Sequence, residues 1–224
     1  MDLEISIDNS LKEIIKLSII QFNQVQVVKR IDALVDDIET LSSELRQKYQ
    51  STTDAMELLN VTRSLYRKIG LDPTKNRPSS EALLRRVLKG NSLYQINSIV
   101  DTCTLCSLKF LLSLGLYDVD KIKGSIQLRI GTEGEGYDGI RKEHVNVSGR
   151  FAMVDDLGPF GNPSADSARA MITESTTNVL FVIFAPSDYN EKLLNEHLDF
   201  IEAKVKQYHS CNTVIKELVT VQPC

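Results

Sequence analysis

The feature of the sequence with the clearest chemical potential is a cationic segment, residues 62–90. It carries eight lysines and arginines against two acidic residues, although the whole chain has a formal net charge of −4 at pH 7. Local asymmetry of this kind suits an anionic partner, because phosphate binding depends on local rather than total charge. The alternative is an ordinary solvated helix face.

A glycine motif follows later in the chain. The sequence GEGYDG, residues 134–139, has the spacing of a dinucleotide-binding turn. Such a turn must open a helix whose N-terminus faces the pyrophosphate. The residues that follow are polar and strand-like, so we predict a glycine-rich hairpin or loop instead.

The pair Cys103 and Cys106 has the C-x-x-C spacing of a redox motif or half a zinc site. The two residues lie inside a long apolar stretch with helical spacing, and the sequence contains no second pair of this kind. We therefore predict two buried thiols on one helix face, with no metal and no cofactor.

No complete hydrolytic apparatus is visible. The sequence lacks a G-x-S-x-G elbow, a Walker loop and an H-E-x-x-H motif. His144 lies near the glycine motif, where we expect a solvent-facing strand residue. Residues 162–173, NPSADSARAMIT, gather polar side chains before an expected strand. They form either a functional loop or an ordinary Asx-type turn, and no catalytic residue is assigned.

Apolar periodicity indicates which elements position these residues. Helices are expected in two stretches over about 30–69, from Ser79 as N-cap to Gly90, over 96–112 and over about 189–209. Strands are expected at 3–7, 19–28, 125–130, 144–147, 151–156, 168–173, 178–185 and 213–221. Helices gathered early and strands gathered late favour an α+β fold over a regular βαβ repeat.

Length and composition are those of a soluble globular domain. The chain has 224 residues, of which 42% are hydrophobic and 25% charged. The longest apolar run, VLFVIFAP at 179–186, is far shorter than the roughly 20 residues needed to cross a bilayer. The N-terminus is acidic and alternating, unlike a signal peptide. We expect a cytoplasmic protein of one domain, 1–224, with no membrane partner.

Residues 96–135, INSIVDTCTLCSLKFLLSLGLYDVDKIKGSIQLRIGTEGE, resemble the B3/B4 domain of the bacterial phenylalanyl-tRNA synthetase beta subunit. The strand at 176–186, TTNVLFVIFAP, is similar to a later strand of that family, and the cationic segment is similar to its free-standing members. The resemblance covers about 60–186. It implies a three-layer arrangement with an unusual β-sandwich core and flanking helices. Residues 1–60 would then add a strand and helix region, and 187–224 a C-terminal helix and strand.

The resemblance also implies kinship with a module that hydrolyses tyrosine wrongly attached to phenylalanine tRNA. The editing residues of the family do not carry over, because its Asn, His and Glu fall on Thr104, Gly115 and Val182. Loss of buried polar partners erases discrimination of a substrate hydroxyl. The positions that do match, most of which we interpret as scaffold, are Asn97, Asp101, Asp118, Gly124 and Arg129.

The favoured hypothesis is a free-standing module that binds tRNA or another RNA, with aminoacyl-tRNA deacylation of unknown specificity as a further activity. The predicted phosphate contacts are Arg63, Arg67, Lys75, Arg77, Arg85, Arg86 and Lys89. Tyr66 and Tyr94 are the aromatic residues near them that could stack on bases.

The alternatives are a small-molecule protein that binds an amino-acid-like ligand without tRNA, and a fold retained for protein interaction. The predicted pocket residues are Glu81, Asn97, Thr104, Gly115, Asp166, Ser167, Arg169 and Val182. A concave site shared by the arginines of 77–86 and Arg169 would favour the small molecule. A convex cationic rim would favour RNA.

Overall fold

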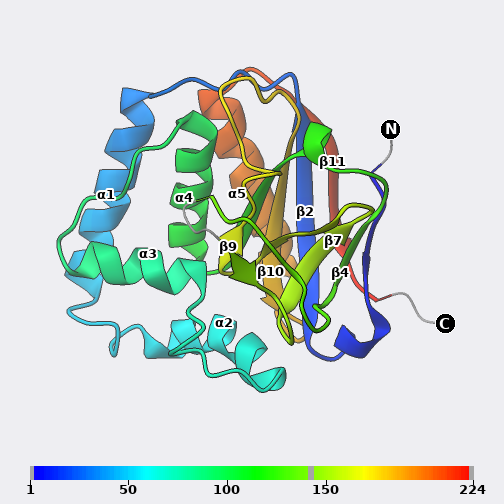
Figure 1. The fold of residues 1–224 in the computed structure, drawn as a ribbon. Helices are drawn as coiled ribbons and strands as arrows, with labels where there is room; N and C mark the ends of the chain where they lie inside the picture. Colours follow the sequence, from blue (N-terminus) through cyan, green and yellow to red (C-terminus); the bar gives the residue numbers. More distant parts are fainter. Residues whose placement is uncertain (1–2, 141–143, 222–224) are drawn as a thin grey trace.

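The protein is built in three layers: a group of helices, a central sheet and a second sheet that covers the other face of the central one (Figure 1). The computed structural model describes residues 3–140 and 144–221. Helices on one side and largely antiparallel sheets on the other confirm the predicted α+β class.

The elements have the following bounds. The helices are α1 Asp32–Lys48, α2 Met56–Lys68, α3 Ser79–Leu88, α4 Ser98–Phe110 and α5 Glu191–Tyr208. The strands are β1 Ile5–Ile7, β2 Ile15–Asn23, β3 Ser113–Asp118, β4 Ile126–Ile130, β5 Gly136–Tyr137, β6 Val145–Asn146, β7 Phe151–Asp155, β8 Gly158–Asn162, β9 Ala165–Asp166, β10 Val179–Pro186 and β11 Asn212–Val219. Two short 3-10 turns are η1 Asn9–Leu11 and η2 Val119–Lys121.

The central sheet has the strand order β11-β2-β10-β3 and is antiparallel throughout. Every residue of β10 is buried. One face of this sheet packs on α4 and α5 through residues such as Phe22 and Phe181, and the other packs on the second sheet through residues such as Leu180. A strand covered on both faces needs apolar side chains in both directions, which explains the uninterrupted run VLFVIFAP.

The second sheet has the order β1-β4-β7-β8-β9, with β1 parallel to β4 and the other neighbours antiparallel. The core between the sheets contains Leu17, Leu128, Phe151 and Val182. β5 pairs with β6, which confirms the predicted glycine-rich hairpin.

Four expectations about elements need correction. Residues 168–173 form turns and irregular backbone rather than a strand. β8 and β9 instead follow β7 in the second sheet, with β9 at its edge. β8 was missed because Gly158, Pro159 and Gly161 give it the composition of a turn. Ser79 is the first residue of α3 rather than its N-cap, which is Pro78. The strand expected at 19–28 is β2, which begins and ends earlier, at Ile15–Asn23.

Tyr117 of β3 packs between the two sheets, against β8. This residue is fully buried, and its ring lies edge-on to Phe160 with 5.0 Å between centroids. A Cβ atom added at Gly115 or at Gly161 would lie 2.4 Å from the Tyr117 hydroxyl oxygen. Both glycines are therefore required by the close approach of the Tyr117 ring.

We expect Gly161→Ala to lower the free energy of unfolding by about 1–3 kcal/mol, the usual cost of overpacking a core. Urea denaturation measures it. In a Tyr117→Ala background the added methyl group has room, so the same substitution should cost much less. Equal costs in both backgrounds would show that Tyr117 is not what excludes a side chain at Gly161.

Candidate functional site

The cationic segment is organised around one buried carboxylate, that of Glu81, whose side chain is 1% exposed. Arg63 donates to Glu81 from Nε and Nη2, both at 2.7 Å, and Arg85 donates from Nε at 2.9 Å. The Nε atom of Arg77 lies 3.7 Å from Oε1. One carboxylate therefore holds three guanidinium groups, and the cluster keeps an excess of positive charge.

The pKa of Glu81 reflects two opposing causes. Burial raises it, whereas hydrogen bonds from Arg63 and Arg85 lower it and prevail, so the pKa lies below its ordinary value. Glu81 is thus ionised at neutral pH and belongs to the cluster that shapes the cationic surface.

The arginines of the cluster differ in accessibility. Arg63 is 6% exposed and ties α2 to α3, so it supports the surface from within. The side chains of Arg77 and Arg85 are 42% and 35% exposed. These two remain able to contact a ligand while they are held by Glu81.

The rest of the predicted RNA contacts lie at the surface. Arg67, Lys75 and Lys89 are exposed. The Arg86 guanidinium stacks on the ring of Tyr94 at 4.0 Å from its centroid, and Arg86 Nε donates to the carbonyl of Ser92 at 2.6 Å. Tyr94 is 58% exposed, which leaves an aromatic surface beside the cations.

Tyr66 is the other aromatic residue that the sequence placed near the cations. It is buried, and its hydroxyl lies 2.5 Å from Ser164 Oγ. Tyr66 therefore belongs to the hydrophobic core and does not present its ring at the surface for bases to stack on.

A pocket of about 300 Å³ opens beside this segment. Lys75 and Arg77 reach it from the turn before α3, and Arg150 reaches it from the residue before β7. Arg150 was missed by the sequence analysis, because a lone arginine after a turn carries no motif. The other lining residues are Tyr66, Leu71, Asn76, Ala82, Val145, Phe151, Asn162, Pro163, Ser164 and Ala165.

The residues that the sequence predicted for a pocket lie outside this lining. Gly115 of β3 pairs directly with Val182 of β10, so these two are brought together. The Tyr117 side chain takes up the space over Gly115. Thr104 lies partly buried on α4.

Asn97 and Arg169 have structural partners. The Asn97 side chain accepts from Val100 N and caps α4. Arg169 donates to both carboxylate oxygens of Asp155 at 2.9 Å and to the carbonyl of Lys121 at 3.1 Å. Arg169 thus ties its loop to the second sheet and does not share a pocket with Arg77.

The matching family positions Asp101 and Asp118 behave as scaffold, as interpreted from the sequence. Asp101 accepts from the backbone N–H of Ile96, and Asp118 accepts from that of Asp120 and from the Thr176 hydroxyl. Both carboxylates therefore fix local backbone geometry.

Asp166 combines burial with a perturbed pKa. Its Oδ1 atom is buried and has no hydrogen-bond partner among the described residues. Burial raises the pKa of Asp166 to about 7, and the nearby Tyr117 hydroxyl lowers it by a smaller amount. Such a value suits a general base, but Asp166 lines neither pocket described here. Its neighbour Ser167 is buried and accepts from Ala170 N.

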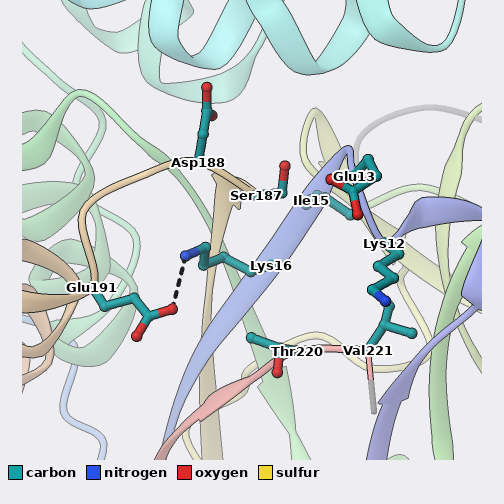
Figure 2. Close-up of a pocket in the computed structure, with 9 residues that line it drawn as sticks. All are labelled: Lys12, Glu13, Ile15, Lys16, Ser187, Asp188, Glu191, Thr220 and Val221. Atoms are coloured by element: carbon teal, nitrogen blue, oxygen red, sulfur yellow. Dashed lines mark hydrogen bonds and ion pairs between the residues drawn. The ribbon is translucent and has the colours of Figure 1, made fainter. Parts of the chain in front are cut away.

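A second pocket, of about 270 Å³, lies between the start of β2 and the start of α5 (Figure 2). The buried amino group of Lys16 points to Glu191 and donates to its Oε1 and to the carbonyl of Tyr189, both at 3.1 Å. Glu13, Asp188 and Glu191 outnumber the two lining lysines. Lys16 therefore joins β2 to α5, and this pocket has no surplus of positive charge.

Cys103 and Cys106 are buried on α4, which confirms the prediction of two buried thiols on one helix, and burial raises the pKa of both thiols. Over residues 3–140 and 144–221, no cluster of three or more His, Cys, Asp or Glu side chains could hold a metal ion. None of the helices described has the length and apolar character needed to span a membrane.

Comparison with known proteins gives one family and one solved structure. A family model described as B3/4 domain matches residues 61–195. An N-terminal fragment of the phenylalanyl-tRNA synthetase beta-subunit from Pyrococcus horikoshii is similar at 13% identity and a TM-score of 0.47, over 99% of this chain and 51% of that one. The chain thus spans about half the length of that fragment. No curated protein matches.

We expect Glu81→Gln to lower the free energy of unfolding by roughly 3–5 kcal/mol, because the buried Arg63 loses its counter-charge. Since the pKa of Glu81 is lowered, its contribution is present at neutral pH and is lost as the pH falls through the folded-state pKa. Urea denaturation at pH 7 measures the change. Glu57→Gln, at an exposed position of α2, is the control and should change stability little. Similar effects of the two variants would contradict the assigned role of Glu81.

We expect Asp166→Asn to stabilise the protein more at pH 8 than at pH 5. A carboxyl whose folded pKa is about 7 holds its proton in the folded state after the unfolded chain has lost it, so stability falls as the pH rises from about 4 to 7. The asparagine variant lacks this penalty. Melting temperatures at both pH values test it, and the gain should be a few degrees, at about 2–4 °C per kcal/mol. Asp138→Asn, at an exposed position, is the control. A gain that does not depend on pH would refute a raised pKa at Asp166.

Proposed function

The chain belongs to the B3/4 domain family, and on that premise we propose that it is a module that binds tRNA or another structured RNA. The binding surface is formed by α2, α3 and the turn between them, which lie together at one end of the molecule (Figure 1). The observation that carries the proposal is the cluster in which the buried Glu81 holds Arg63, Arg77 and Arg85.

The surface of the segment is more positive than its composition indicates. Of its two acidic residues, Glu81 is buried beneath arginines. Asp72 is exposed, but its carboxylate accepts hydrogen bonds from the backbone and hydroxyl of Thr74 at 2.8 and 2.7 Å. A polyanion that approaches α3 therefore meets an excess of cationic side chains, with Asp72 as the exposed acid of the segment, and this excess favours contacts with phosphates.

The Arg86–Tyr94 pair adds an element that suits RNA in particular. Proteins that bind unpaired bases combine a positive groove with aromatic side chains on which bases stack. Tyr94, whose ring contacts the Arg86 guanidinium and which is 58% exposed, brings an aromatic side chain to this cationic surface. The resemblance to the synthetase module makes tRNA the first RNA to test.

The proposal is binding without hydrolysis. The three editing positions carry Thr104, Gly115 and Val182, which supply neither an imidazole nor a carboxylate. Among the described residues that line the pocket beside α3, none is His, Asp or Glu, so no general base is placed there. A mischarged tRNA should therefore be bound by this protein but not deacylated.

Fluorescence anisotropy with labelled tRNA, from 50 to 200 mM salt, tests the proposal. The test variant combines Arg67→Gln, Arg86→Gln and Lys89→Gln, which leaves the Glu81 cluster intact. If each cation contacts a phosphate, the slope of log affinity against log salt should fall by about 2–3 in magnitude. Affinity at 50 mM salt should fall at least tenfold.

The matched control combines Lys12→Gln, Lys121→Gln and Lys192→Gln. It removes the same charge from exposed positions outside the cationic segment. It should keep tRNA affinity within about threefold of the parent. Equal losses of affinity in the two triple variants would show that binding depends on net charge and not on the proposed surface. If the parent protein did not bind tRNA at 50 mM salt, the proposal would be refuted.

A further inference from the structure

The pocket beside α3 has three cations and no compensating carboxylate among its described lining residues. Over residues 3–140 and 144–221, neither Lys75 nor Arg150 forms an ion pair, although the charge of the exposed Asp72 acts on Lys75. The contact of Arg77 with Glu81 is long, at 3.7 Å, and Arg63 and Arg85 already hold that carboxylate more closely. An excess of positive charge in a concave site concentrates anions.

The start of α3 adds to this field. The first turn of the helix borders the pocket, because Arg77 just before it and Ala82 within it are both lining residues. The N–H of Ser79 donates to the carbonyl of Pro163 at 3.2 Å, and Ser80 and Glu81 are buried outside the pocket lining. The contribution of this turn to the pocket is therefore the positive potential of the helix dipole.

The remaining walls suit a flat apolar group. Leu71, Val145, Phe151 and Pro163 line the pocket, and the ring of Tyr66 meets that of Phe151 edge-on at 6.4 Å between centroids. The volume of about 300 Å³ is at the lower end of the range for small-molecule sites. The apolar side chains in this lining would make no favourable contact with an inorganic ion, so the ligand we expect has an apolar part as well as an anionic group.

The polar part of the lining, around Asn162, is held in place by hydrogen bonds. Asn162 is buried, and its Oδ1 accepts from the backbone N–H of Ser164 and of Ala165 at 2.7 and 3.0 Å. Its amide nitrogen donates to Tyr137 at 2.8 Å. This part of the lining is therefore preorganised, which lowers the conformational entropy lost when a ligand binds.

We infer that this pocket binds a phosphate monoester attached to a planar ring, of which a nucleoside monophosphate is the simplest example. Lys75, Arg77 and Arg150 hold the phosphate, and the ring lies against Phe151 and its apolar neighbours. A phosphate monoester carries a charge of about −1.5 to −2 at pH 7. It therefore balances the charge of several cations better than a ligand with one carboxylate would. The inference goes beyond RNA binding and does not need it, because a free nucleotide would occupy the same site.

Isothermal titration calorimetry with AMP, adenosine and inorganic phosphate as probes tests the inference. AMP should bind at least tenfold more tightly than either half alone. Lys75→Gln with Arg150→Gln should weaken AMP binding at least tenfold. Both residues are exposed, so the melting temperature without ligand should not change.

The matched control, Arg86→Gln with Lys89→Gln, removes the same charge from the far end of α3 and should keep AMP affinity within twofold. Absence of AMP binding by the parent would overturn the inference, as would equal losses in the two double variants. AMP binding without tRNA binding would refute only the RNA proposal, and the reverse would refute only the pocket assignment.

Two RNA oligonucleotides, with a 5′-phosphate and with a 5′-hydroxyl, then identify the source of the phosphate monoester. A preference for the 5′-phosphate that disappears in the Lys75→Gln, Arg150→Gln variant supports recognition of a terminal nucleotide. Equal binding of both, with AMP binding retained, supports a free nucleotide as the ligand.

Discussion

The arrangement of the cationic end of the molecule depends on one constraint: an ionised carboxylate, that of Glu81, lies in the interior. A buried charge without partners costs several kcal/mol, so Glu81 must keep its arginines. Arg63 satisfies it from α2 and Arg85 from its own helix, which fixes α3 against α2. The charge that the carboxylate does not neutralise is displayed on the surface and toward the pocket. The buried carboxylate of Glu81 thus holds the arginines that contact it in defined positions at this end of the molecule.

A second constraint acts between the sheets. Tyr117 occupies the space that glycines leave at positions 115 and 161, and Val182 lies opposite Gly115 on the neighbouring strand. Gly115 and Val182 are two of the positions at which the resemblance locates the editing residues, and here they are part of a packed core. The Tyr117 ring takes up the space over Gly115. Our proposals therefore assign function to the edge of the sandwich, where α3, the turn before it and β7 meet.

The sequence predicted the features that are local or strongly periodic. The α+β class, the long buried strand β10, the glycine-rich hairpin and the buried thiols on α4 were all expected from spacing and composition. The resemblance supplied the family, which the family match at 61–195 confirms. These features depend on neighbours in the chain or on a pattern many residues long.

The features that sequence could not supply depend on contacts between distant segments. Nothing in the chain distinguishes Arg63, which is buried against Glu81, from Arg67 one turn later, which is exposed. Arg150 reaches the pocket from 73 positions beyond Arg77, without a motif to link them. The segment 168–173 has the composition of a strand, but the bidentate bond of Arg169 to Asp155 holds its start in a turn.

Hydrogen–deuterium exchange of the protein, with and without saturating tRNA, tests most directly whether the surface organised by Glu81 is where RNA binds. The account predicts slower exchange in peptides that cover 72–95, with α5 and β11 unchanged. Protection confined to α5 and β11, or no protection under conditions in which tRNA is bound, would contradict it.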